Sequence, residues 1–261
     1  MLDRSHYTAL YAAYAVAMAG ALIAGKIRRR SWPASVSPTF ARPWRELGYA
    51  MFAAICVIGV GQLYQAGIRL TIRGGLAPIF ESINQLLIFS PMIVLLILRR
   101  HSPATAWLPL RNVGAHVVTG ILLAAVAVLV FTVVRSGTAG WPVVVGRLVH
   151  PKNVDILVQV FLEDFSIAVI LVRVGAALRR PMLAALLVAA LFAAGHIPAM
   201  LSGGATAGEL ARLLLDFGLG AFVLLTVQRT GSIWWLVWIH YAMDMMQFDR
   251  IVGPAATSSA G

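Results

Sequence analysis

The chain has 261 residues, of which 60% are hydrophobic and only 12% are charged, against about 25% charged residues in a typical soluble domain. Long apolar runs recur along the whole chain, so the sequence predicts an all-α, polytopic membrane helix bundle and not a soluble protein. The formal net charge of +11 does not indicate a nucleic acid partner, because the basic residues gather at the ends of apolar runs, as membrane topology requires. Cys56 is the single cysteine, which excludes an internal disulfide and a cysteine-based metal cluster.

Eight apolar stretches approach the ~20 residues with which a helix crosses the core of a bilayer. The predicted spans cover residues 7–25, 47–67, 76–98, 114–134, 155–174, 182–200, 210–227 and 231–247. We expect one integral membrane domain over residues 1–261, in which residues 155–247 carry the motifs. A basic, proline-containing loop at 28–46 and a flexible tail at 250–261 complete the predicted organisation.

Lysine and arginine are unevenly divided between the two ends of the predicted spans. With the N-terminus outside, 12 of these residues lie in inside loops and 8 lie at outside ends, and the first inside loop supplies half of the 12. Because cytoplasmic loops carry an excess of Lys and Arg, this division predicts that both termini lie outside.

Ionisable residues within the predicted spans are the main functional signal of the sequence. Each is costly inside a membrane and therefore marks a candidate functional position. They concentrate in the second half of the chain: Glu163, Asp164, His196, Asp216, His240 and Asp244.

The spacing of these residues predicts which of them share a helix face. His240 and Asp244 are four residues apart, so they project from the same face about one turn from each other. Glu163 and Asp164 point about 100° apart on a helix, so only one of them can face a given cavity squarely. Asp216 has no partner at helical spacing, and we interpret it as structural.

Carboxylates and imidazoles on neighbouring helices form a set that can activate water. One group removes a proton from the water, and another stabilises the oxyanion that develops. Glu163, His196, His240 and Asp244 are also suitable ligands for a divalent metal such as zinc. An ion or proton pathway would use the same residue types. Residue types and spacing alone therefore indicate a hydrolytic site or a metal site and leave a conduction pathway open.

Three short motifs follow one another in the second half of the chain: "EDFSIA" at 163–168, "FAAGH" at 192–196 and "HYAMD" at 240–244. They resemble the motifs of the CAAX protease and bacteriocin-processing family of intramembrane endopeptidases, also called the CPBP or Abi family. That family shows Glu-Glu-x-x-x-Arg, then Phe-x-x-x-His, then His-x-x-x-Asn or His-x-x-x-Asp. The lead-in "GSIWWLVWIH" is also similar, and the resemblance covers about residues 155–247.

The resemblance implies an eight-helix bundle with a membrane cavity that is open to substrate. It implies that Glu163 and His196 activate the attacking water, whereas His240 and Asp244 bind the substrate carbonyl and stabilise the oxyanion. Asp164 matches the second acid of the family's pair. The implied activity is that of an endopeptidase, metal-dependent or metal-free, which cuts a membrane-associated peptide or a prenylated protein. The family and the alanine- and arginine-rich composition place the expected location in a bacterial inner membrane.

Two departures from the family pattern leave other functions open. Asp164 stands where the family has glutamate, and Ala168 stands where it has arginine. Arg173 lies five residues further on, about one and a half turns away, so it cannot simply substitute. The alternatives are a non-catalytic membrane scaffold and a site recruited for other metal-dependent chemistry on a lipid or small molecule. A transporter is the weakest alternative, since the sequence shows no inverted repeat.

Overall fold

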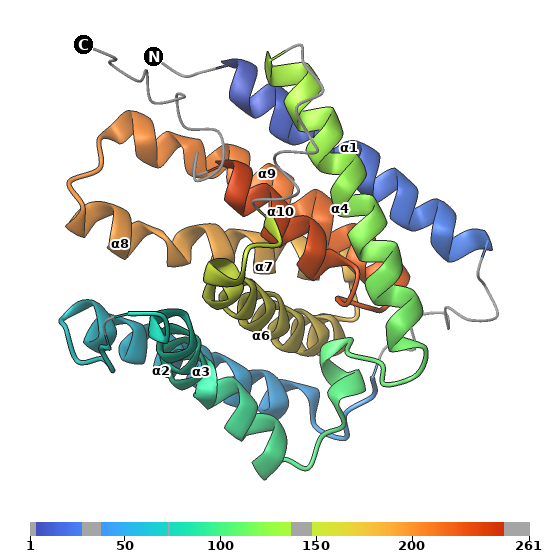
Figure 1. Cartoon of the computed structure of the whole chain (residues 1–261). Helices are drawn as coiled ribbons and strands as arrows, with labels where there is room; N and C mark the ends of the chain where they lie inside the picture. The colour runs from blue at the N-terminus through green and yellow to red at the C-terminus, as the bar shows by residue number, and fades with distance from the viewer. Residues whose placement is uncertain (1–3, 28–37, 73, 137–147, 248–261) are drawn as a thin grey trace.

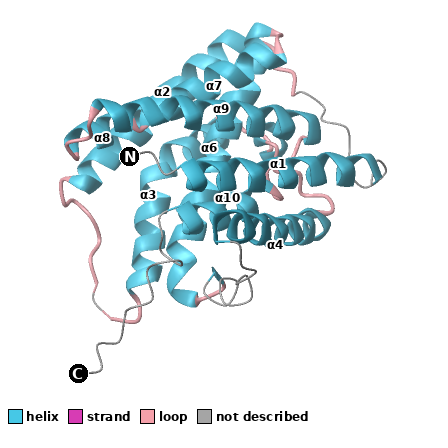
Figure 2. Cartoon of the chain, turned by 90° about the horizontal axis from the view of Figure 1, so that it is seen from above, coloured by secondary structure: helices cyan, strands magenta, loops and turns pink. Residues whose placement is uncertain are grey.

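The computed structural model describes residues 4–27, 38–72, 74–136 and 148–247 of the chain. All regular structure in these ranges is helical and none of it is strand, so the predicted all-α class is confirmed (Figures 1 and 2). The helices are α1 (Arg4–Ile27), α2 (Pro43–Gln65), α3 (Ala77–Leu98), α4 (Val113–Ser136), α6 (Val154–Leu178), α7 (Pro181–Gly195), α8 (Ile197–Ser202), α9 (Ala207–Thr230) and α10 (Leu236–Gln247). The predicted tail at 250–261 and residues 28–37 of the predicted loop lie outside the described residues.

The helices have the lengths and compositions of a polytopic membrane protein. Within the described ranges, five of them are long and apolar enough to cross a membrane: α1, α2, α3, α4 and α9. α6 is as long as these at 25 residues, but ionisable side chains interrupt its apolar sequence. The predicted membrane helix bundle is therefore confirmed, and α6 is its unusual member.

Three predicted boundaries were wrong, each because of a glycine or a proline. The predicted span 182–200 is divided into α7 and α8 next to Gly195 and Pro198, and proline disrupts the helical turn that precedes it. The predicted span 231–247 starts later, at Leu236, because Gly231 ends α9 in the left-handed conformation with φ 63°. The predicted loop 28–46 ends sooner, because Pro43 begins α2, a position that proline favours.

α6 lies at the centre of the bundle. The hairpin of α2 and α3 packs against one side of it, and α7 and α10 contact it from the other (Figure 1). α1 packs against α4 and α9, while α10 also packs against α4. Most of the side chains that α6 buries are apolar, but Asp164 and Arg173 are buried among them.

α4 and α10 approach each other closely at Gly120. A Cβ at this position would lie 2.7 Å from the carbonyl oxygen of Trp235 and 2.7 Å from Cδ1 of Trp238. The obstructing atoms include backbone, which cannot turn away as a flexible side chain would. Gly120 therefore sets the distance at which α10, the helix of His240 and Asp244, packs against α4.

We expect the Gly120→Ala substitution to destabilise the protein by about 1–3 kcal/mol, because the added methyl group overpacks the contact between α4 and α10. The measurement is the apparent melting temperature in detergent. Gly114→Ala is the matched control on the same helix, since no atom lies within 4 Å of its added Cβ. Equal melting temperatures for the two variants would contradict the close contact.

Candidate active site

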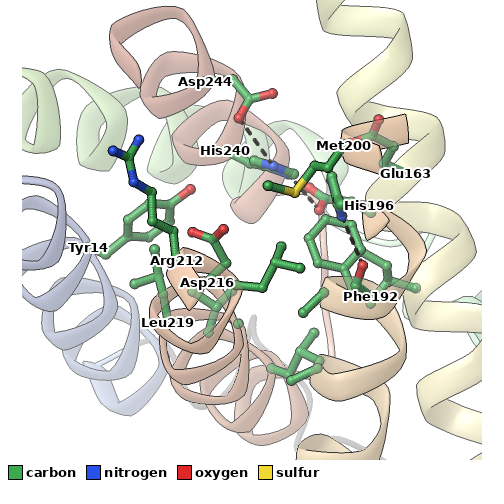
Figure 3. A pocket seen from close by; sticks show the side chains of 18 of the residues that line it. Tyr14, Glu163, Phe192, His196, Met200, Arg212, Asp216, Leu219, His240 and Asp244 are labelled. Atoms are coloured by element: carbon green, nitrogen blue, oxygen red, sulfur yellow. Dashed lines mark hydrogen bonds and ion pairs between the residues drawn. The ribbon is translucent and has the colours of Figure 1, made fainter. Parts of the chain in front are cut away.

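A cavity of about 830 Å³ lies inside the bundle, between α1, α6, α7, α8, α9 and α10 (Figure 3). Its walls include all the ionisable residues singled out in the sequence: Glu163, Asp164, His196, Asp216, His240 and Asp244. Side chains that are far apart in the sequence therefore face one shared cavity.

His240 is held between two acids. Its Nδ1 donates a hydrogen bond to Oδ1 of Asp164 at 2.9 Å, and its Nε2 lies 3.7 Å from Oδ1 of Asp244. Asp164 is only 4% exposed, so this hydrogen bond lies away from water. The spacing predicted the proximity of Asp244, but it gave no sign that Asp164 is the closer partner. The Asp164 contact fixes the orientation of the imidazole ring.

Glu163 faces the same cavity with a different partner. Its Oε1 accepts a hydrogen bond from Nε2 of Gln159, one turn earlier on α6, at 2.9 Å. The two adjacent acids thus diverge, as the angle between neighbouring helical positions predicts. Gln159 was not predicted from the sequence, although a glutamine four residues before an acid on a helix indicates a side-chain contact.

His196 lies at the point where α7 ends. Its Nδ1 donates to the carbonyl oxygen of Phe192 at 2.9 Å, and the two rings meet edge to face with centroids 4.8 Å apart. Phe192 therefore packs beside the imidazole ring. With Nδ1 acting as donor, Nε2 of a neutral ring is left as an acceptor. Within the described residues, no hydrogen bond joins His196 directly to Glu163.

The opposite wall of the cavity contains residues that the sequence analysis missed. Asp216, which the sequence led us to interpret as structural, lines the cavity together with Arg212, one turn before it on α9 (Figure 3). Tyr7 and Tyr14 of α1 also line it, so the first half of the chain contributes to the site. The spacing of four between Arg212 and Asp216 was the available signal.

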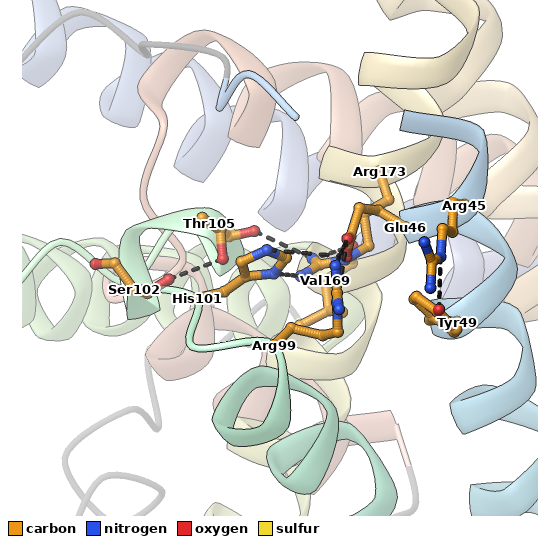
Figure 4. Close-up of polar contacts among 9 residues, drawn as sticks. All are labelled: Arg45, Glu46, Tyr49, Arg99, His101, Ser102, Thr105, Val169 and Arg173. Carbon is orange, nitrogen blue, oxygen red and sulfur yellow. Dashed lines mark hydrogen bonds and ion pairs between the residues drawn. The ribbon is translucent and has the colours of Figure 1, made fainter. Parts of the chain in front are cut away.

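Arg173 does not reach the motif acids. It is fully buried at the other end of α6, where its guanidinium donates to Nδ1 of His101 at 3.0 Å (Figure 4). Nε2 of His101 in turn lies 3.8 Å from Oε2 of Glu46, and Glu46 accepts a hydrogen bond from Arg99 at 2.5 Å. We call Arg173, His101, Glu46 and Arg99 the Arg173 cluster. It joins α6 to α2 and to the end of α3, while Ala168 is buried in the apolar core.

The predicted zinc site requires three or four ligand atoms around one point. Among the described residues, no three His, Cys, Asp or Glu side chains are grouped so that they could hold a metal ion. Nδ1 of His240 is occupied by its hydrogen bond to Asp164, so only Nε2 of this histidine remains as a possible ligand atom. The described side chains are therefore not grouped around one metal position, and metal content is the measurement that tests the predicted zinc site.

These features define a polytopic membrane protein with a polar, histidine- and acid-lined cavity inside its helix bundle. Residues 154–246 match a family model, described as type II CAAX prenyl endopeptidase Rce1-like. Over these residues the match confirms the resemblance to the CAAX protease family that the three motifs indicated. It runs from α6 to α10, which supply every wall of the cavity except the one from α1. Comparisons with curated proteins and with solved structures gave no match.

We expect the purified wild-type protein to carry no stoichiometric metal, because its histidines and acids are not grouped as ligands. The measurement is elemental analysis of the wild type beside His196→Ala and His240→Ala, each equilibrated with zinc and then desalted. All three samples should show the same low content. One equivalent of metal in the wild type, lost in both variants, would contradict the arrangement.

The Arg173 cluster predicts a dependence of stability on pH. Burial, and then the charge of Arg173, lower the pKa of His101 below its ordinary value. The unfolded chain therefore binds the proton more readily, and stability is lost as the pH falls through about 6.5. We expect the apparent melting temperature to fall from pH 7.5 to pH 5.5, and His101→Gln to reduce that fall. An unchanged pH dependence in the variant would contradict this role of His101.

Proposed function

We propose that this protein is an intramembrane peptidase that uses activated water to cut a peptide bond in a membrane-associated peptide or protein. The observation that carries the proposal is the meeting of Glu163, His196 and the Asp164–His240 pair in one cavity, within the segment that matches the CAAX endopeptidase family.

Glu163 is the proposed general base. One of its carboxylate oxygens is engaged by Gln159, which holds the side chain in place and leaves Oε2 for a water molecule. Nε2 of His196 is an acceptor in the same cavity, because Nδ1 is bound to the carbonyl of Phe192. Glu163 takes the proton from a water that also hydrogen-bonds to His196, and the protonated Glu163 then delivers that proton to the leaving amine.

His240 is the proposed group for the oxyanion. The hydrogen bond from Nδ1 to Asp164 fixes the ring, so that a doubly protonated imidazole donates through Nε2 in one direction. Asp244 borders that position, with Oδ1 3.7 Å from Nε2. An ionised Asp244 can only accept hydrogen bonds, so it orients His240 and does not itself stabilise the oxyanion.

A specific feature favours the second candidate, a non-catalytic membrane scaffold. Ala168 occupies the arginine position of the family motif and lies in the apolar core, so no arginine of α6 pairs with Glu163 or Asp164. In a scaffold the cavity would bind a partner without cleaving it, and the acids and histidines would be dispensable.

We expect Glu163→Gln and His196→Ala each to lower cleavage by about 100-fold or more, the range for loss of a general base. The measurement is profiling of new protein N-termini in membranes from cells that express the wild type or a variant. Glu81→Gln is the control, because Glu81 is an acid of α3 outside the cavity, bonded to Tyr64 and Asn84. Identical N-termini for the wild type and both site variants, at equal expression, would favour the scaffold.

A further inference from the structure

We infer that the cavity opens on the extracytoplasmic face of the membrane, so that its substrates are polypeptide segments presented from that side. The substrate class rests on the proposed function. The side on which the cavity opens rests only on the fold and on the distribution of charge.

The cavity has an open end and a closed end. Exposed residues line it where α8 leads into α9, including Gly203 and Gly204. Buried apolar residues line it at the opposite end, among them Val223 of α9 and Leu236 at the start of α10. We call the first the mouth and the second the floor.

Hydrogen bonds between connecting segments show which helix ends share the floor side. Nε1 of Trp234 donates to the carbonyl of Pro109 at 3.0 Å, which places the start of α10 beside the start of α4. Nε2 of Gln228 donates to the carbonyl of Pro181 at 3.0 Å, which places the end of α9 beside the start of α7. The Arg173 cluster adds the end of α6, the end of α3 and the start of α2.

The mouth side therefore has the opposite helix ends. They are the connection between α2 and α3, the end of α4, the start of α6 and the start of α9, together with the start of α1. α1 belongs to this set because it runs antiparallel to α4: His6, near its start, packs against Phe131, near the end of α4. Gly20, further along α1, faces Leu123, which lies earlier in α4.

Positive charge is concentrated on the floor side. Among the described residues, nine cations besides the buried Arg173 lie there: Lys26, Arg42, Arg45, Arg99, Arg100, Arg111, Arg179, Arg180 and Arg229. Five lie on the mouth side: Arg4, Arg69, Arg135, Lys152 and Arg212.

Arg212 lines the cavity, so it contributes less than the other cations to the positive charge that sets membrane orientation. The positive-inside rule therefore assigns the floor side to the cytoplasm and the mouth to the opposite face.

This orientation narrows the substrate class. A prenylated protein anchored to the cytoplasmic leaflet would meet the closed floor, whereas a segment that emerges on the outer face would meet the mouth. The cavity walls hold five acids, Glu163, Asp164, Glu209, Asp216 and Asp244, against two cations, Arg212 and the doubly protonated His240 of the proposed mechanism. Such a lining favours a neutral or basic peptide segment over an acidic one.

The test is labelling of single cysteines in spheroplasts with a membrane-impermeant maleimide, in the full chain carrying Cys56→Ser. Gly75→Cys reports on the mouth side, where the position is exposed and no atom lies within 4 Å of the added Cβ. Leu110→Cys reports on the floor side, where Leu110 is 73% exposed. Neither change removes a cation, so the signal that sets topology stays intact.

We expect Gly75→Cys to be labelled in intact spheroplasts and Leu110→Cys only after permeabilisation. The reverse pattern, or labelling of both before permeabilisation, would overturn the inference. Labelling needs no catalysis, so this result is independent of the Glu163→Gln experiment. If labelling gives the expected topology but Glu163→Gln leaves the N-termini unchanged, the proposed peptidase activity is contradicted and the outward-facing cavity is still supported.

Discussion

The cost of placing a charged group in an apolar membrane interior shapes this structure more than any other constraint. α6 concentrates that cost, because it carries Glu163, Asp164 and Arg173 within the centre of the bundle. Each of them finds a polar partner: Gln159 on α6 itself, His240 on α10, and His101 after α3. The packing of the other helices around α6 is therefore also the means by which its polar groups are satisfied.

Two polar centres on one helix have separate roles. At the cavity, Asp164 orients the ring of His240. Towards the floor, the Arg173 cluster connects α2 and α3 to α6. The family motif would have an arginine at the position of Ala168, one turn from the acids. Here an imidazole and an amide contact those acids instead, so the acids keep hydrogen-bond partners without a neighbouring guanidinium.

Much of the fold could be predicted because apolar runs of bilayer length read directly as helices. The break after Gly195 and the late start of α10 were missed, because single glycines and prolines act locally inside runs that look continuous. Within the site, the pairing of His240 with Asp244 followed from helical periodicity. The pairing with Asp164 did not, since it joins residues 76 positions apart and depends on how α10 packs on α6 through Gly120 and α4. The contribution of Tyr14 from α1 was invisible for the same reason.

The long separation between Asp164 and His240 has a consequence for how the protein is made. When α6 leaves the ribosome, the helix that supplies His240 has not been synthesised, since it follows 76 residues later. α6 is therefore synthesised before Asp164 has its partner on α10. α2 and α3, made earlier, already offer His101 and Glu46 to its other end. The order of the helices thus permits assembly in two stages, in which Arg173 docks α6 on α2 and α3 before α10 supplies the partner of Asp164.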